Sequence, residues 1–199
     1  MNATQVQTGY QPVHQEEVSM RTMAGGALMQ SVGALATMAL AIAGLAGVLS
    51  TTLAAIAVIV LGAAIWMEGG AFIASHRTEV FGASAGAQTI AWGQRLSAEF
   101  LGGLSGVILG ILALLGVIPL TLLPVAALVF GATFLFSSGN WMGSGTQPIF
   151  GLAGVTLGLL AICGLDPLTL VLVALLSLGA SALLNGAANG FRATIASDR

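Results

Sequence analysis

Charged residues are scarce in this chain. They make up 6% of its 199 residues, and the basic ones are all arginines. Soluble domains carry charge at roughly a quarter of their positions, so the composition excludes an ordinary soluble fold. The five arginines and seven acidic residues form no basic patch, which excludes nucleic-acid binding. Hydrophobic residues make up 57% of the chain, and we predict an integral membrane protein that contacts the lipid bilayer.

Residues that carry chemistry are equally scarce. Cys163 is the only cysteine, which excludes an intramolecular disulfide and a metal cage built of cysteines. The two histidines, His14 and His76, are far apart and lack a partner at ligand spacing. No nucleophile elbow, phosphate loop or dinucleotide fingerprint is present. The sequence therefore predicts no enzyme activity, no bound metal and no cofactor.

Six apolar runs account for most of the chain. A membrane-spanning helix needs about 20 apolar residues, and the runs cover residues 24–48, 53–75, 100–118, 121–138, 149–165 and 168–189. The predicted fold class is all-α, with six transmembrane helices in one domain over residues 24–190. We expect a polar, mobile tail over residues 1–23, a polar loop over residues 76–99, and a short tail over residues 191–199. Ile90, Trp92 and Leu96 are spaced for a short interfacial helix inside that loop.

The sequences of the apolar runs repeat along the chain. Residues 103–132 align with residues 151–180 at 18 of 30 identical positions. A diverged copy, with GVLSTTL in place of GVIPLTL, lies near residue 50. A repeat of this kind indicates one supersecondary unit used several times. The sequence predicts three helical hairpins, over residues 24–75, 100–138 and 149–189.

The hairpin tips share their chemistry. Gly116 and Gly164 are expected to leave the first helix with positive φ, and Pro119 and Pro167 to open the second helix. With six spans, all five arginines fall on one side of the membrane. The positive-inside rule assigns that side to the cytoplasm, so both termini are expected there. Asp166 is then the only charge at the opposite tips, where it is expected to cap the following helix.

Small residues recur along the first helices of the second and third hairpins. They follow a spacing of four residues, at Gly102, Gly106, Gly110, Gly154 and Gly158. Such a stripe lets two helix backbones approach closely. Two interpretations stay open, namely packing within the monomer and a glycine-zipper face that joins protomers.

Glu68 is the one ionisable residue inside an otherwise apolar run. The repeat alignment places Ser137 and Asn185 at the equivalent positions of the other copies. An ionisable residue in a bilayer suggests a functional site, so the three residues form a candidate polar cluster. The alternatives are hydrogen bonds that join helices, or simple placement at the headgroups.

The repeated sequence motif resembles that of a known family. A GVxLGxLAxxGxxPLTL segment followed by VAxLxxGA is similar to the HdeD-like proteins, short six-span membrane proteins built of three hairpins. This resemblance covers residues 24–190. It implies a bacterial inner-membrane protein with a link to acid stress, and no catalytic residues.

Two functions follow from these observations. The first is a non-enzymatic membrane protein with a structural or stress-related role, which forms a homo-oligomer or joins other membrane proteins. The second is a small transporter or channel that uses the polar cluster near Glu68.

Overall fold

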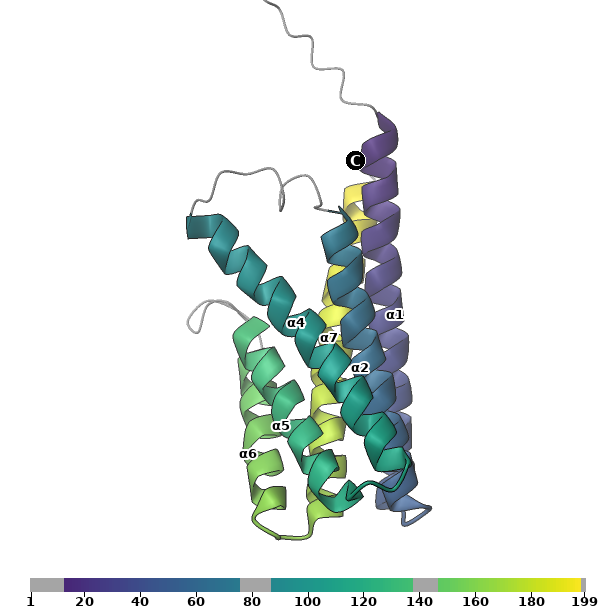
Figure 1. Cartoon of the computed structure of the whole chain (residues 1–199). Coiled ribbons are helices and arrows are strands. Elements are labelled where there is room, and N and C mark those ends of the chain that lie inside the picture. Colours follow the sequence, from purple (N-terminus) through teal and green to yellow (C-terminus); the bar gives the residue numbers. More distant parts are fainter. Residues whose placement is uncertain (1–12, 76–86, 138–146, 198–199) are drawn as a thin grey trace, which may run out of the picture.

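The computed structural model describes residues 13–75, 87–137 and 147–197, and it places side chains for residues 28–68, 70, 99–137 and 148–187. Six helices make up nearly all of this described part, which contains no strand. They are α1 (Val13–Leu45), α2 (Ser50–Ser75), α4 (Ala87–Leu114), α5 (Pro119–Ser137), α6 (Gln147–Ile162) and α7 (Pro167–Ser197), shown in Figure 1.

Several helices are long and apolar enough to cross a membrane. Four such stretches occur among the described residues, and the remaining two helices contain shorter apolar stretches, at Glu99–Leu114 and Pro148–Ile162. A helix rises 1.5 Å per residue, so these two reach only about 22–24 Å of the ~30 Å hydrocarbon core. The helices fit a multi-pass membrane protein. The four longer stretches are Leu28–Leu45, Ser50–Glu68, Pro119–Ser137 and Pro167–Ala187.

The helices are joined in pairs by three tight tips. Each tip begins with a glycine at positive φ, namely Gly47 at 86°, Gly116 at 82° and Gly164 at 89°. The residue two places later also has positive φ, and Pro119 or Pro167 opens the next helix in the second and third tips. The predicted roles of the glycines and prolines are therefore confirmed.

Hydrogen bonds show how the glycine ends the helix. The amide of Gly116 donates to the carbonyl of Ala113 at 3.1 Å, and the amide of Val117 donates to the carbonyl of Leu112 at 3.1 Å. This pair of bonds is a Schellman motif, which satisfies carbonyls that the helix end leaves unpaired. At the third tip, Asp166 lies directly before α7. Its carboxylate accepts a hydrogen bond at 2.8 Å from Oγ1 of Thr169, which is in the first turn of that helix.

The predicted helix boundaries were wrong at the tips. We expected the first helices to end at residues 48, 118 and 165, whereas they end at Leu45, Leu114 and Ile162. The turn residues beyond these ends are mostly apolar, so hydropathy did not separate them from the helices. The left-handed glycine sets the boundary instead.

Other boundaries differ because polar residues also form helix. α4 begins at Ala87 and runs unbroken to Leu114, so residues 87–99 belong to it and form neither a loop nor a separate interfacial helix. α1 begins at Val13 and α7 continues to Ser197, inside the tails predicted at residues 1–23 and 191–199. Residues 1–12, 76–86 and 138–146 lie outside the described part.

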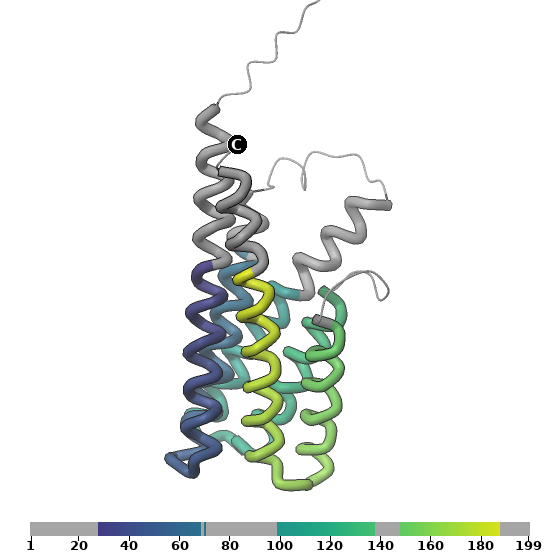
Figure 2. Tube along the Cα trace, turned by 180° about the vertical axis from the view of Figure 1, so that it is seen from behind, coloured from purple at the N-terminus to yellow at the C-terminus, as the bar shows by residue number. Residues whose placement is uncertain are grey.

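The hairpins pack in a cyclic order. α2, α5 and α7, the second helices of the three hairpins, contact one another. Each first helix lies between its own partner and the second helix of another hairpin: α1 between α2 and α7, α4 between α5 and α2, and α6 between α7 and α5. Figure 2 shows α1 beside α7, which closes the ring. All three tips lie at one end of the bundle, which we call the tip end (Figure 1). We call the other the open end.

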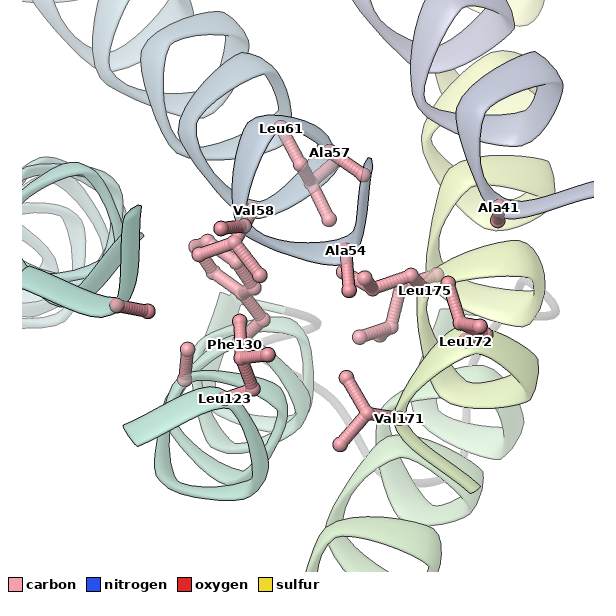
Figure 3. Packing of buried hydrophobic residues seen from close by; sticks show 14 of the residues in the cluster. Ala41, Ala54, Ala57, Val58, Leu61, Leu123, Phe130, Val171, Leu172 and Leu175 are labelled. Atoms are coloured by element: carbon pink, nitrogen blue, oxygen red, sulfur yellow. The ribbon is translucent and has the colours of Figure 1, made fainter. Parts of the chain in front are cut away.

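The centre of the bundle is filled by side chains of the three second helices. Val58, Phe130 and Val171 point from α2, α5 and α7 toward a shared interior (Figure 3). Leu61, Phe130 and Leu178 are fully buried. On each helix one row of buried residues recurs at alternating steps of four and three, which keeps this row on one face. These axial residues are Ala54, Val58, Leu61 and Ile65 on α2, Leu123, Ala127, Phe130 and Phe134 on α5, and Val171, Leu175, Leu178 and Ala182 on α7.

Candidate functional site

The five glycines of the predicted contact face are all buried inside the chain. A methyl group on Gly110 would lie 3.1 Å from the carbonyl oxygen of Ala55 on α2. One on Gly158 would lie 3.0 Å from the amide nitrogen of Leu128 on α5. Gly102 and Gly106 face Thr133 and Phe130 on α5, and Gly154 faces Gly131 and Leu178.

This arrangement decides between the two interpretations of the stripe for these residues. Contacts within the chain occupy all five positions, so a second protomer has no access to them. The zipper interpretation is therefore wrong for Gly102, Gly106, Gly110, Gly154 and Gly158, and they act in packing the monomer.

The closest approaches to the backbone of a neighbouring helix involve glycines that the sequence stripe did not include. A Cβ on Gly103 would lie 2.6 Å from the amide nitrogen of Trp66, and one on Gly131 would lie 2.5 Å from that of Val155. Gly62 and Gly151 complete these two crossings, α2 on α4 and α5 on α6. The repeat alignment matches Gly62 with Gly131 and Gly103 with Gly151. These close crossings could therefore have been predicted from the repeat, although the four-residue glycine spacing did not indicate them.

Glu68, Ser137 and Asn185 continue the axial faces by one more turn toward the open end. Each lies three residues beyond the last buried axial residue of its helix, namely Ile65, Phe134 or Ala182. Ser137 is 4% exposed, and its hydroxyl donates to the carbonyl of Phe134 at 3.4 Å. Glu68 and Asn185 are partly buried. At this level the apolar interior ends, and each of the three second helices has a polar residue there.

The first helices add polar residues at the same level. Phe100 on α4 packs against Trp66 on α2 with ring centroids 5.9 Å apart, which fixes the register of these helices. Glu99 is adjacent to Phe100 and therefore lies near the level of Glu68. Gln30 on α1 is 1% exposed.

Sequence reasoning missed Gln30 and Glu99. The repeat alignment places them at equivalent positions, together with Gln147, whose side chain lies outside the described ones. We call Gln30, Glu68, Glu99, Ser137 and Asn185 the polar layer. Extending the alignment from the second helices to the first would have found its two additional members.

Two buried oxygens lack a hydrogen-bond partner within the described part of the chain. They are Gln30 Oε1 and Ser181 Oγ. Ser181 is 1% exposed and lies one turn from Asn185 on α7. An unpaired polar atom in an apolar interior is destabilising by about 1–3 kcal/mol.

We expect Ser181→Ala to raise the free energy of unfolding by about 1 kcal/mol, because it removes an unpaired hydroxyl. Titration of the detergent-solubilised protein with sodium dodecyl sulfate, followed by tryptophan fluorescence, measures this change. Thr133→Val is the matched control. Thr133 aligns with Ser181, but its hydroxyl donates to the carbonyl of Val129 at 2.8 Å, so no gain is expected. Destabilisation by Ser181→Ala would contradict the prediction.

Among the described residues, no three His, Cys, Asp or Glu side chains form a metal-binding group. The polar layer nevertheless brings two carboxylates, a hydroxyl and two carboxamides to one level of an apolar bundle.

No protein-family model, curated protein or solved structure matches this chain. The similarity to the HdeD-like family therefore stays a prediction.

Proposed function

We propose that this chain is a six-span membrane protein with a non-enzymatic, structural role. All six helices expose large apolar side chains, a surface that suits lipid and not water. Examples are Val32, Met67, Ile108, Phe136, Leu159 and Leu184. In this proposal the two shorter apolar stretches also cross the membrane, with help from the helical residues that flank them.

The proposed orientation places the open end in the cytoplasm. Both α1 and α7 have their terminal ends there, and all three tips lie at the opposite end (Figure 1). The five arginines all lie outside the tips, which favours this side by the positive-inside rule. The HdeD-like resemblance suggests the bacterial inner membrane and a stress-related role.

The filled centre is the observation that favours a structural role. Leu61, Phe130 and Leu178 are fully buried where the three second helices meet. A channel needs a polar or open path at this place. The side chains described here instead close the axis with apolar atoms.

In this proposal the protein acts through contacts with a second copy or with other membrane proteins. Because the buried glycines are already occupied, such contacts would use the exposed apolar faces of the outer helices. These faces offer large side chains for packing against another membrane helix.

Subunit counting tests this proposal. Cys163 is exposed at a tip and is the only cysteine, so one fluorophore marks each protomer. We expect more than one bleaching step per particle, or a second membrane protein in the same particle as the labelled chain, after direct extraction into nanodiscs. Cys163→Ser is the control for non-specific labelling. Single-step particles that also contain no other protein would contradict a role in assembly.

The polar layer supports a second candidate, a small transporter or channel. Glu68 and Glu99 place two carboxylates on neighbouring helices beside an apolar core, and intramembrane carboxylates commonly mark ion pathways. A flux assay in proteoliposomes, comparing the intact protein with Glu68→Gln, separates the two candidates. Flux that the variant loses would favour transport over a structural role.

A further inference from the structure

Gln30 carries one of the two buried, unpaired oxygens among the described residues, and it is the one that lies in the polar layer. It is 1% exposed, and its Oε1 has no hydrogen-bond partner within the described residues. A buried amide oxygen is normally paired. The Oε1 atom of Gln30 therefore keeps an unused capacity to accept a hydrogen bond or to coordinate a cation.

The helix register turns Gln30 toward the bundle interior, at the level of Glu68. Gly33 on α1 faces Ala64 on α2, because a methyl group on Gly33 would meet the Cβ of Ala64 at 2.6 Å. Gln30 lies three residues before Gly33, and Glu68 lies four residues after Ala64. In an α-helix, positions three or four apart share a face. Since α1 and α2 are antiparallel neighbours, both steps lead one turn toward the open end.

Glu99 approaches the same place from α4. α2 contacts both α1 and α4, and the packing of Phe100 on Trp66 places Glu99, the residue before Phe100, near the level of Glu68. The carboxyl groups of Glu68 and Glu99 and the amide oxygen of Gln30 thus lie at one level of the bundle, on the neighbouring helices α2, α4 and α1. Ser137 and Asn185, also in the polar layer, lie on α5 and α7.

This donor set has a specific chemistry. Carboxylates and neutral amide oxygens are the ligands of hard divalent cations such as Ca²⁺ and Mg²⁺. Softer metals prefer thiolate or imidazole ligands, which none of the five residues supplies. Two neighbouring carboxylates repel each other, and a divalent cation between them would reverse that repulsion.

We propose that the polar layer binds a hard divalent cation, held by the carboxylates of Glu68 and Glu99 and by Oε1 of Gln30. Binding links α1, α2 and α4 at the open end and so fastens the first hairpin to the second. The proposal is independent of both proposed functions, because a bound cation needs neither assembly nor transport.

The test uses the full-length protein in detergent after treatment with a chelator. Tryptophan fluorescence follows thermal unfolding during titration with Ca²⁺, and electron paramagnetic resonance follows binding of Mn²⁺ as a direct probe. We expect saturable binding and a rise in apparent melting temperature of roughly 5 °C or more near saturation.

Three variants locate the site. Glu68→Gln and Glu99→Gln preserve shape and remove charge, so each is expected to weaken Mn²⁺ binding about tenfold or more. Gln30→Leu removes the unpaired oxygen. It is expected to weaken binding while leaving the cation-free protein at least as stable. Asp166→Asn, at the opposite end of the bundle, is the matched charge control and is expected to bind as the wild type does.

Several results would overturn the proposal. One is wild-type protein that neither binds Mn²⁺ nor gains stability from Ca²⁺ at millimolar concentrations. In that case a water molecule or a protonated carboxyl group donates a hydrogen bond to Oε1 of Gln30 instead. Another is binding that persists unchanged in Glu68→Gln and Glu99→Gln. If those variants do not fold, the wild-type Mn²⁺ signal and its competition by Ca²⁺ still decide whether a cation binds, and Gln30→Leu decides where.

Discussion

Replacing Gly131 by alanine is expected to lower the free energy of unfolding by about 3 kcal/mol. The added methyl group would lie 2.5 Å from the amide nitrogen of Val155 and 2.8 Å from the carbonyl oxygen of Gly151. Both atoms belong to the backbone of α6, which cannot rotate away as a side chain can. The helices must therefore separate, and the dispersion contacts that hold α5 to α6 are lost along the crossing.

Gly70→Ala is the matched control for this experiment. Gly70 is also helical, but an added Cβ there meets nothing within 4 Å. Alanine favours a helix over glycine by about 1 kcal/mol, so this variant is expected to be as stable as the wild type or slightly more so. Unfolding in sodium dodecyl sulfate measures both. Equal stability of Gly131→Ala and the wild type would show that the α5–α6 crossing is looser than described.

The hairpin tips were predictable because their structure depends on local chemistry. A glycine that can adopt positive φ, followed three residues later by proline, determines the helix end and the next helix start. Gly116, Pro119, Gly164 and Pro167 behave as this rule requires. Even the first tip, with Ser50 in place of proline, follows the same path.

The helix limits were less predictable because hydropathy reports burial in lipid and not backbone conformation. Ile118 is apolar and falls inside the predicted run over residues 100–118, yet it lies in a tip at positive φ. The opposite error occurred in residues 87–99, where polar side chains concealed helical backbone at the start of α4.

The candidate site was only partly predictable. The alignment identified Glu68, Ser137 and Asn185, since a polar residue in a hydrophobic run is conspicuous. Gln30 and Glu99 were overlooked because a polar residue near the end of a run is equally compatible with the headgroups. Only the packing of α1 and α4 on α2 turns these two residues toward the interior.

Phe130→Ala is expected to lower the free energy of unfolding by about 2–3 kcal/mol. Phe130 is fully buried where α2, α5 and α7 meet, and Figure 3 shows its ring beside Val58. In water-soluble cores the same change is destabilising by about 3–5 kcal/mol. The expected value is smaller here because the unfolded helices remain in an apolar solvent, which removes much of the hydrophobic transfer term. What remains is the loss of dispersion contacts around the cavity.

Phe136→Ala on the same helix separates this core effect from a general effect of losing a phenyl ring. Phe136 is 74% exposed, so lipid or detergent replaces its contacts in both states and the change is expected to be within about 0.5 kcal/mol of zero. Both variants are measured by the same unfolding titration, in detergent and in lipid nanodiscs. If Phe136→Ala is as destabilising as Phe130→Ala in nanodiscs alone, the exposed face of α5 packs against another protein chain there. That outcome would leave the core argument intact and locate the surface through which the protein assembles.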